Sequence, residues 1–205
     1  MKYKGLIIAC FLVAACSHEG PARDYHPYLA SKGISSIAPD AIPHCHGYGC
    51  RLHSTVSLEK SEWKQVGQYF KTGRDAVQER DAIAKAIGTL ETLVGKKAGT
   101  DTDIAGTYRT LGNDQHDCVD ESVNTTVYLS LLQQKNLLKH HDISTISTRI
   151  PLFGGGLGFH QTAVIVEKET GQRYAVDSWF HDNGHAAAVI PLADWIYGWD
   201  PPKGK

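Results

Sequence analysis

The chain has 205 residues, which is enough for one domain of ordinary size with its own hydrophobic core. Its 21 lysines and arginines nearly balance 22 aspartates and glutamates, and no large block of either sign occurs along the sequence. A nucleic-acid-binding surface needs a concentration of positive charge that this sequence does not show. We therefore expect no nucleic-acid partner.

The N-terminus has the architecture of an export signal. Lys2 and Lys4 form a short basic segment, and residues 5–15 then carry no charge. This apolar run is shorter than the roughly 20 residues that a membrane-spanning helix needs. We therefore predict that residues 1–15 are a signal peptide.

Small residues stand directly before Cys16, in the sequence VAAC (13–16). This pattern resembles the lipobox of bacterial lipoproteins. The resemblance implies that Cys16 receives acyl chains such as palmitate, becomes the mature N-terminus and anchors the chain to a membrane. Ser17 is not the aspartate associated with retention at the inner membrane, so the implied location in the cell envelope is the periplasmic face of the outer membrane. An ordinary secretory signal with a chance cysteine, or a buried N-terminal helix, are the alternatives.

Export to an oxidising compartment changes how the five cysteines are interpreted. Cys10 leaves with the signal and Cys16 carries lipid. Cys45 and Cys50 lie in a short glycine-containing loop, HCHGYGC (44–50), and we expect them to form a disulfide. Cys118 then has no partner. An unpaired thiol in an exported protein is either buried or used, so the count nominates Cys118 as a reactive residue.

The same loop offers side chains that suit zinc or copper. They are His44, Cys45, His46, Cys50 and His53. Their spacing matches no standard zinc module, and an oxidised cysteine pair cannot bind a metal as thiolates. A metal site and two free thiols are the alternatives to the disulfide, and we expect neither a metal nor another cofactor.

Glycine and proline without periodicity make residues 16–43 a candidate lipidated tether, followed by a single domain at 44–205. Apolar spacing predicts a helix over 58–70 that is capped by Ser57, and a second over 76–94 that stops at Gly95.

A third helix should begin at Asp117 or Cys118, which places the cysteine at its N-terminus. Apolar residues at every fourth position should form one buried stripe on this helix. They are Val119, Val123, Val127 and Leu131.

After this helix the apolar period falls to two, which is typical of strands. Residues 143–150, the run that begins at His160, and 173–178 are the predicted strands, and 191–199 could hold a short helix and an aromatic cluster. The order predicts an α+β domain, with helices first and an antiparallel sheet after them.

Three residues in this order could carry chemistry: Cys118 at a helix start, His160 at the start of a strand and Asp177 at the end of the next. A helix N-terminus lowers the pKa of a thiol, because its backbone N–H groups favour the thiolate. A histidine can then hold the proton while a carboxylate orients its ring.

This order resembles the transglutaminase-like and papain-like cysteine hydrolases, including the motif YAVDSW (174–179) around Asp177. The resemblance covers residues 110–182 and implies a core of that kind there. It also implies a thiol hydrolase or acyltransferase that acts on a peptide, protein or peptidoglycan-type amide. The sequence CVDES (118–122) looks like uncharacterised bacterial lipoproteins rather than an enzyme with an assigned substrate.

Negative charge near the cysteine should raise the pKa of the thiol and oppose the effect of the helix. The nearby carboxylates are Asp114, Asp117, Asp120 and Glu121. His116 is a nearer base in sequence but a weaker candidate, and Gln115 could serve an oxyanion.

Two alternatives to a thiol hydrolase remain open. One is a non-catalytic envelope lipoprotein with a structural role, or one that binds a partner through its aromatic tail. The other is a metal site made by His160 with His181, Asp182 and His185.

Overall fold

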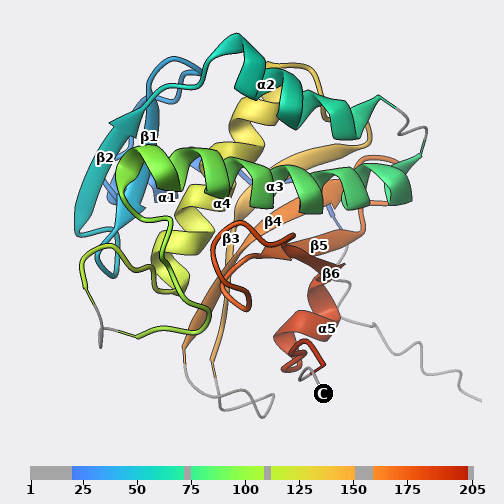
Figure 1. Ribbon diagram of the computed structural model, residues 1–205. Helices are drawn as coiled ribbons and strands as arrows, with labels where there is room; N and C mark the ends of the chain where they lie inside the picture. The colour runs from blue at the N-terminus through green and yellow to red at the C-terminus, as the bar shows by residue number, and fades with distance from the viewer. Residues whose placement is uncertain (1–19, 72–74, 109–111, 151–158, 203–205) are drawn as a thin grey trace, which may run out of the picture.

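The computed structural model describes residues 20–71, 75–108, 112–150 and 159–202, and it has an α+β fold (Figure 1). The predicted signal peptide, Cys10 and Cys16 lie outside these residues. Among the residues that are described, no helix combines the length and apolar character needed to cross a membrane.

The sheet has four antiparallel strands in the order β3-β4-β5-β6, so each strand pairs with its neighbour in sequence. These strands are β3 (His141–Arg149), β4 (His160–Glu167), β5 (Arg173–Asp177) and β6 (Ala188–Pro191). Every residue of β4 except Glu167 is buried, as expected of a strand that is covered on both faces. The prediction of helices followed by an antiparallel sheet is confirmed, and β6 is an addition to it.

Helix α4 (Cys118–Gln134) runs through the middle of the domain, and in Figure 1 it passes behind α3. It packs against β3, β4 and β5 of the sheet and also against β1 and α3. The predicted stripe is buried at Val123, Val127 and Leu131, and Val119 is half-buried. Residues 120–132 are buried without interruption, so the other faces of the helix are buried as well. Small polar side chains fill the remaining faces because they find partners there: Asn124 exchanges hydrogen bonds of 2.7 and 2.8 Å with the backbone of Cys45.

The two helices before α4 differ from their predicted ends. Helix α2 (Lys60–Gly67) is followed by a 3-10 turn, and its capping box is formed by Glu59 and Glu62 rather than by Ser57. Helix α3 (Ala76–Ala98) continues past the predicted stop. It ends instead at Gly99, whose φ of 77° is the left-handed conformation that glycine adopts readily.

Packing begins earlier in the chain than the predicted domain boundary. Helix α1 (His26–Ser31) lies within the segment expected to be a tether, and Tyr25, Leu29 and Ile34 there are buried in the main core. Strands β1 (Ile42–His46) and β2 (Leu52–Val56) then form an antiparallel hairpin whose connection contains the cysteine loop.

Candidate functional site

Cys118 is the first residue of α4, and a reciprocal cap fixes its position. Asp117 Oδ1 accepts hydrogen bonds of 3.0 Å from the backbone N–H groups of Val119 and Asp120. Asp120 Oδ2 accepts in return from the Asp117 N–H at 3.1 Å. This capping box holds the helix start in a defined conformation, and the helix begins where the sequence predicted.

Asp120 also holds the cysteine loop. Its two carboxyl oxygens accept from the backbone N–H groups of Tyr48 and Cys50 at 2.8 and 2.6 Å. Burial, reinforced by the charge of Asp117, raises the pKa of Asp120 to about 7. This carboxylate therefore connects α4 to the β1–β2 hairpin.

The thiol of Cys118 is buried, with 3% of the residue exposed. Its Sγ makes a weak contact of 3.9 Å with the carbonyl oxygen of Phe159, and the backbone N–H of Gln161 also approaches the sulfur. Burial raises the pKa of the thiol to about 12, and the charges of Asp117 and Asp177 add to this effect. The backbone N–H groups of Gln161 and Cys118 oppose the rise without overcoming it. The pKa of the thiol is therefore raised, as expected from the nearby carboxylates, but burial is the largest cause of the rise.

His160 and Asp177 come together as the strand order predicts. Ala163 pairs with Val176 in the β4–β5 register, and because side chains alternate along a strand, His160 and Asp177 project from the same face. His160 Nε2 donates to Asp177 Oδ2 at 2.7 Å. The indole Nε1 of Trp195 donates to the same oxygen at 2.7 Å. Two donors thus hold the carboxylate, and the carboxylate fixes the imidazole.

Aromatic rings surround His160. The ring centroids of Trp179, Phe180 and Trp195 lie 4.6, 5.3 and 5.4 Å from that of the imidazole, and 2% of His160 is exposed. Its Nδ1 is buried and makes no hydrogen bond with the described residues, Cys118 included. The sulfur therefore lies beside the backbone on either side of His160, but no hydrogen bond joins the two side chains.

Trp195 of the aromatic tail belongs to this site, whereas Tyr197 of the same tail is exposed. Helix α5 (Leu192–Ile196) carries Trp195, which is fully buried. Arg149 lies over the Trp195 ring at 4.9 Å and donates bonds of 2.8 Å to the backbone carbonyls of Trp195 and Trp199. The contact of Trp195 with Asp177 escaped the sequence reasoning, although a buried indole N–H generally needs an acceptor.

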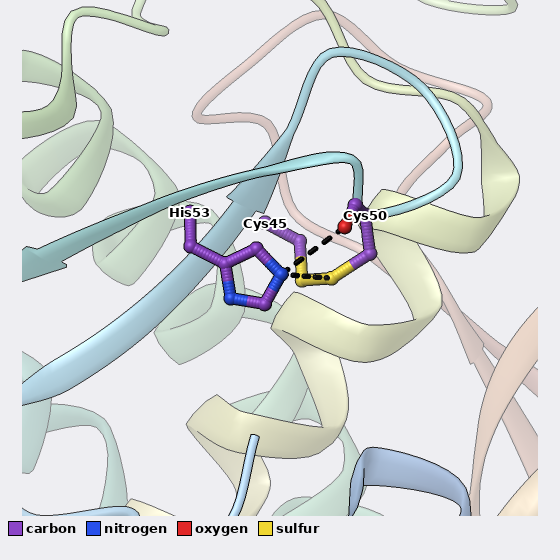
Figure 2. A group of neighbouring side chains, drawn as sticks. All are labelled: Cys45, Cys50 and His53. Atoms are coloured by element: carbon purple, nitrogen blue, oxygen red, sulfur yellow. Dashed lines mark hydrogen bonds between the residues drawn. A yellow bond between two sulfur atoms is a disulfide. The ribbon is translucent and has the colours of Figure 1, made fainter. Parts of the chain in front are cut away.

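The predicted disulfide residues lie together, with Cys45 near the end of β1 and Cys50 in the loop that follows it (Figure 2). Cys45 and Cys50 are at disulfide distance, with their Cα atoms 4.7 Å apart. His53 turns toward them from β2, and its Nε2 lies 3.5 Å from Cys50 Sγ and 3.1 Å from the Cys50 carbonyl oxygen. The three side chains are close enough to hold a metal ion, but an oxidised pair offers no thiolate ligands.

Gln115, His181 and His185 do not take the roles that the sequence suggested for them. Gln115 uses both ends of its amide, accepting from the Ile104 N–H and donating to the Thr102 carbonyl, each at 3.0 Å, so it is not free to serve an oxyanion. His181 and His185 have ring centroids 6.3 Å apart, and they are absent from the metal-competent groups found in the described part of the chain.

His116 does not face Cys118. Its Nδ1 lies 3.0 Å from Glu121 Oε1 and 3.3 Å from Asp103 Oδ2, and its Nε2 lies 3.2 Å from His44 Nε2. The sequence identified this histidine only as a weaker candidate for the general base, and nothing in the local pattern predicts that it meets Asp103 and Glu121.

Comparison with known proteins adds no relative from which a role could be transferred. No protein-family model, no curated protein and no solved structure matches the chain, so the resemblance to papain-like and transglutaminase-like hydrolases has no fold match behind it.

Proposed function

We propose that the protein is a lipid-anchored thiol hydrolase or acyltransferase of the bacterial cell envelope, with a papain-like or transglutaminase-like core. Cys118 is the nucleophile, His160 the general base and Asp177 the residue that orients it. One observation carries the proposal: the imidazole of His160 is fixed through Nε2 on Asp177, while its other nitrogen, Nδ1, is left without a partner. A ring held in this way can accept and return a proton at Nδ1.

The chemistry follows from these positions. The thiol proton of Cys118 passes to Nδ1 of His160 while the sulfur attacks the carbonyl carbon of an amide or ester. The bond to the leaving nitrogen or oxygen then breaks, the leaving group takes the proton from His160, and a thioester remains on Cys118. Water or an amine next attacks the thioester while His160 removes its proton. The carbon–sulfur bond then breaks, His160 returns the proton to the sulfur of Cys118, and the product is an acid or a new amide.

The raised pKa of the thiol fits general-base activation. A pKa of about 12 keeps Cys118 protonated at neutral pH, so the resting enzyme holds a thiol rather than a thiolate–imidazolium pair. Proton transfer then accompanies attack. The thiol must exchange its weak contact with the Phe159 carbonyl for Nδ1 of His160, and the backbone N–H groups of Cys118 and Gln161 support the charge that forms on sulfur.

A non-catalytic envelope lipoprotein is the second candidate. The observations that favour it are the buried, protonated thiol and the missing hydrogen bond between Cys118 and His160. In that case the His160–Asp177 pair has a structural role only.

The experiment uses the full chain in detergent and p-nitrophenyl acetate as an acyl donor. We expect release of p-nitrophenolate and an acetyl group on Cys118, located by peptide mass spectrometry so that other thiols do not confuse the result. Cys118→Ala should abolish this acetylation. His160→Gln should slow it by about 10²- to 10⁴-fold, the range for loss of a general base.

His185→Gln is the matched control, because His185 lies on an exposed loop outside the proposed site. It should react at the wild-type rate. Circular dichroism should show that the variants are folded. Acetylation of Cys118 in folded His160→Gln as fast as in the wild type would support the non-catalytic protein.

A further inference from the structure

We infer a second site, separate from the proposed thiol chemistry: the geometry points to a divalent cation of the zinc class bound by His116, Asp103 and Glu121. The ligand atoms are His116 Nδ1 and one oxygen of each carboxylate, and all of them lie within 4.8 Å of one another. Asp103 and His116 belong to the segment between α3 and α4, and Glu121 lies in the first turn of α4.

The spacing of these atoms suits a small cation. His116 Nδ1 lies 3.0 Å from Glu121 Oε1 and 3.3 Å from Asp103 Oδ2. Zinc binds nitrogen and oxygen at about 2.0–2.2 Å, and the ligands of a tetrahedron of that size are roughly 3.3–3.5 Å apart. The two separations from His116 Nδ1 are therefore close to those of a tetrahedral site, and the ligand atoms of the group all lie within 4.8 Å of one another.

The direction of the imidazole supports the same conclusion. Although two carboxylate oxygens lie within 3.3 Å, His116 Nδ1 has no partner with hydrogen-bond geometry among the described residues. A proton on Nδ1 would therefore point squarely at neither oxygen. A lone pair on Nδ1, by contrast, would point into the space that a shared cation needs.

Each ligand is oriented by a partner that leaves the ligating atom free. The backbone N–H of His116 donates to Asp103 Oδ1 at 2.7 Å, and Asp103 Oδ2 faces the imidazole. The Ser178 hydroxyl donates to Glu121 Oε2, and Glu121 Oε1 faces the imidazole. On the far side of the ring, His116 Nε2 lies 3.2 Å from His44 Nε2. Donation from His116 Nε2 to His44 would leave Nδ1 unprotonated and able to bind the cation.

The charge of the cluster also calls for a cation. Asp103, Glu121 and a third carboxyl, Glu91, are 6%, 7% and 6% exposed. Glu91 interacts electrostatically with Glu121, and its Oε1 has no hydrogen-bond partner among the described residues. Within those same residues His116 is the only positively chargeable group that pairs with Asp103 or Glu121. Because buried charges need compensation, two carboxylates and one imidazole suit a divalent ion better than a single proton.

The ligand types select the class of ion. One imidazole and two carboxylates suit zinc and similar transition metals, whereas calcium takes six to eight oxygens. The cation would join the segment before α4 to the first turn of α4, and water would complete its coordination. Its role is therefore to stabilise the start of the helix that carries Cys118.

The experiment measures metal binding by the chelator-treated full chain, with Zn²⁺ and Co²⁺ as probes and Ca²⁺ as the comparison. We expect one equivalent of Zn²⁺, a visible Co²⁺ absorption band typical of low coordination, and a higher melting temperature with Zn²⁺ but not with Ca²⁺. Asp103→Asn and Glu121→Gln should each weaken Zn²⁺ binding by more than about tenfold, since loss of a ligand should exceed the effect of losing an outer partner.

Both variants keep the oxygen that accepts the existing hydrogen bond, so they test charge and ligation rather than shape. His53→Gln, beside the disulfide, is the control and should bind Zn²⁺ as the wild type does. A folded wild-type chain that gains neither a Co²⁺ band nor a higher melting temperature with Zn²⁺ would overturn the inference, and this result does not depend on any variant. Binding that survives both substitutions, or that His53→Gln removes, would overturn it too.

Discussion

His160 and His116 are equally buried histidines, 2% and 3% exposed, yet their surroundings differ in kind. His160 meets one carboxylate and is otherwise enclosed by aromatic rings. His116 lies between two carboxylates and contacts a second imidazole. A single carboxylate orients a ring and leaves one nitrogen for proton transfer, whereas two carboxylates that converge on the same nitrogen create a place for a cation.

The two regions are neighbours without sharing a group. Glu121 lies one turn after Cys118 on α4, and Ser178 directly follows Asp177. The Ser178 hydroxyl donates to Glu121, so the residue that follows Asp177 is joined to a ligand of the proposed cation site. Because no side chain belongs to both groups, substitutions should separate the two properties.

His141 provides a third case, in which both nitrogens are occupied. Nδ1 contacts Glu79 Oε1 at 2.9 Å, and Nε2 lies 3.2 Å from Arg80 Nη1. Glu79 also accepts from the backbone N–H groups of Lys139, His140 and His141 at 2.6 to 3.1 Å. With no ring nitrogen left for chemistry, this histidine should affect stability alone.

The largest expected effect on stability is that of Glu79→Ala. It removes the acceptor for four donors, and we expect the free energy of unfolding to fall by about 3 kcal/mol, the scale for breaking a buried pair. Urea denaturation at pH 7 measures the loss. Acetylation of Cys118 and Zn²⁺ binding should be unchanged in the folded variant; a change in either would break the distinction between the three histidines.

The pH dependence of the same variant sharpens the test. Burial alone would raise the pKa of Glu79, but hydrogen bonds from His141 and from the Lys139 and His140 N–H groups outweigh it and lower the pKa. A carboxylate with a lowered pKa stabilises the fold above its unfolded pKa of about 4.3 and loses that contribution as the pH falls through the lower folded value. The stability difference between wild type and Glu79→Ala should therefore shrink in acid.

Asp177→Asn should have a smaller effect than Glu79→Ala, and it should act on the proposed thiol site alone. An asparagine oxygen can still accept from His160 and Trp195, but it no longer stabilises the imidazolium that forms during attack. We expect acetylation of Cys118 to slow by about 100-fold, equivalent to about 2.7 kcal/mol in the barrier, with Zn²⁺ affinity unchanged. Asp103→Asn should weaken Zn²⁺ binding and leave the rate of Cys118 acetylation unchanged. If each variant altered both properties, the two regions would be one functional unit.

The sequence was sufficient for features that depend on local pattern. The start of α4 at Cys118, the strand that opens with His160 and the close placement of Cys45 and Cys50 follow from caps, periodicity and loop length. The contact between His160 and Asp177 also follows, because a tight turn between antiparallel strands brings their faces together.

What the sequence did not reveal are contacts between distant segments. His116 meets Glu121 only five residues later in the chain, but Asp103 reaches it from 13 residues earlier in the same connecting segment and His44 reaches it from β1. The burial of α4 on all sides was hidden for the same reason: its serines, threonines and Asn124 look like an exposed face until their partners are known. Trp195 likewise became informative only once its indole was placed against Asp177.

Trp195→Phe should have the smallest effect of the three substitutions. It removes the indole N–H from Asp177 Oδ2 while keeping an aromatic ring beside His160 and beneath Arg149. Because Asp177 keeps its bond to His160, we expect a loss of about 1 kcal/mol in the free energy of unfolding, and a rate of Cys118 acetylation that falls much less than in Asp177→Asn. Urea denaturation and the acetylation assay measure the two effects. If Trp195→Phe slowed acetylation as much as Asp177→Asn does, the indole would be the group that controls the carboxylate, and His160 would depend on two orienting residues instead of one.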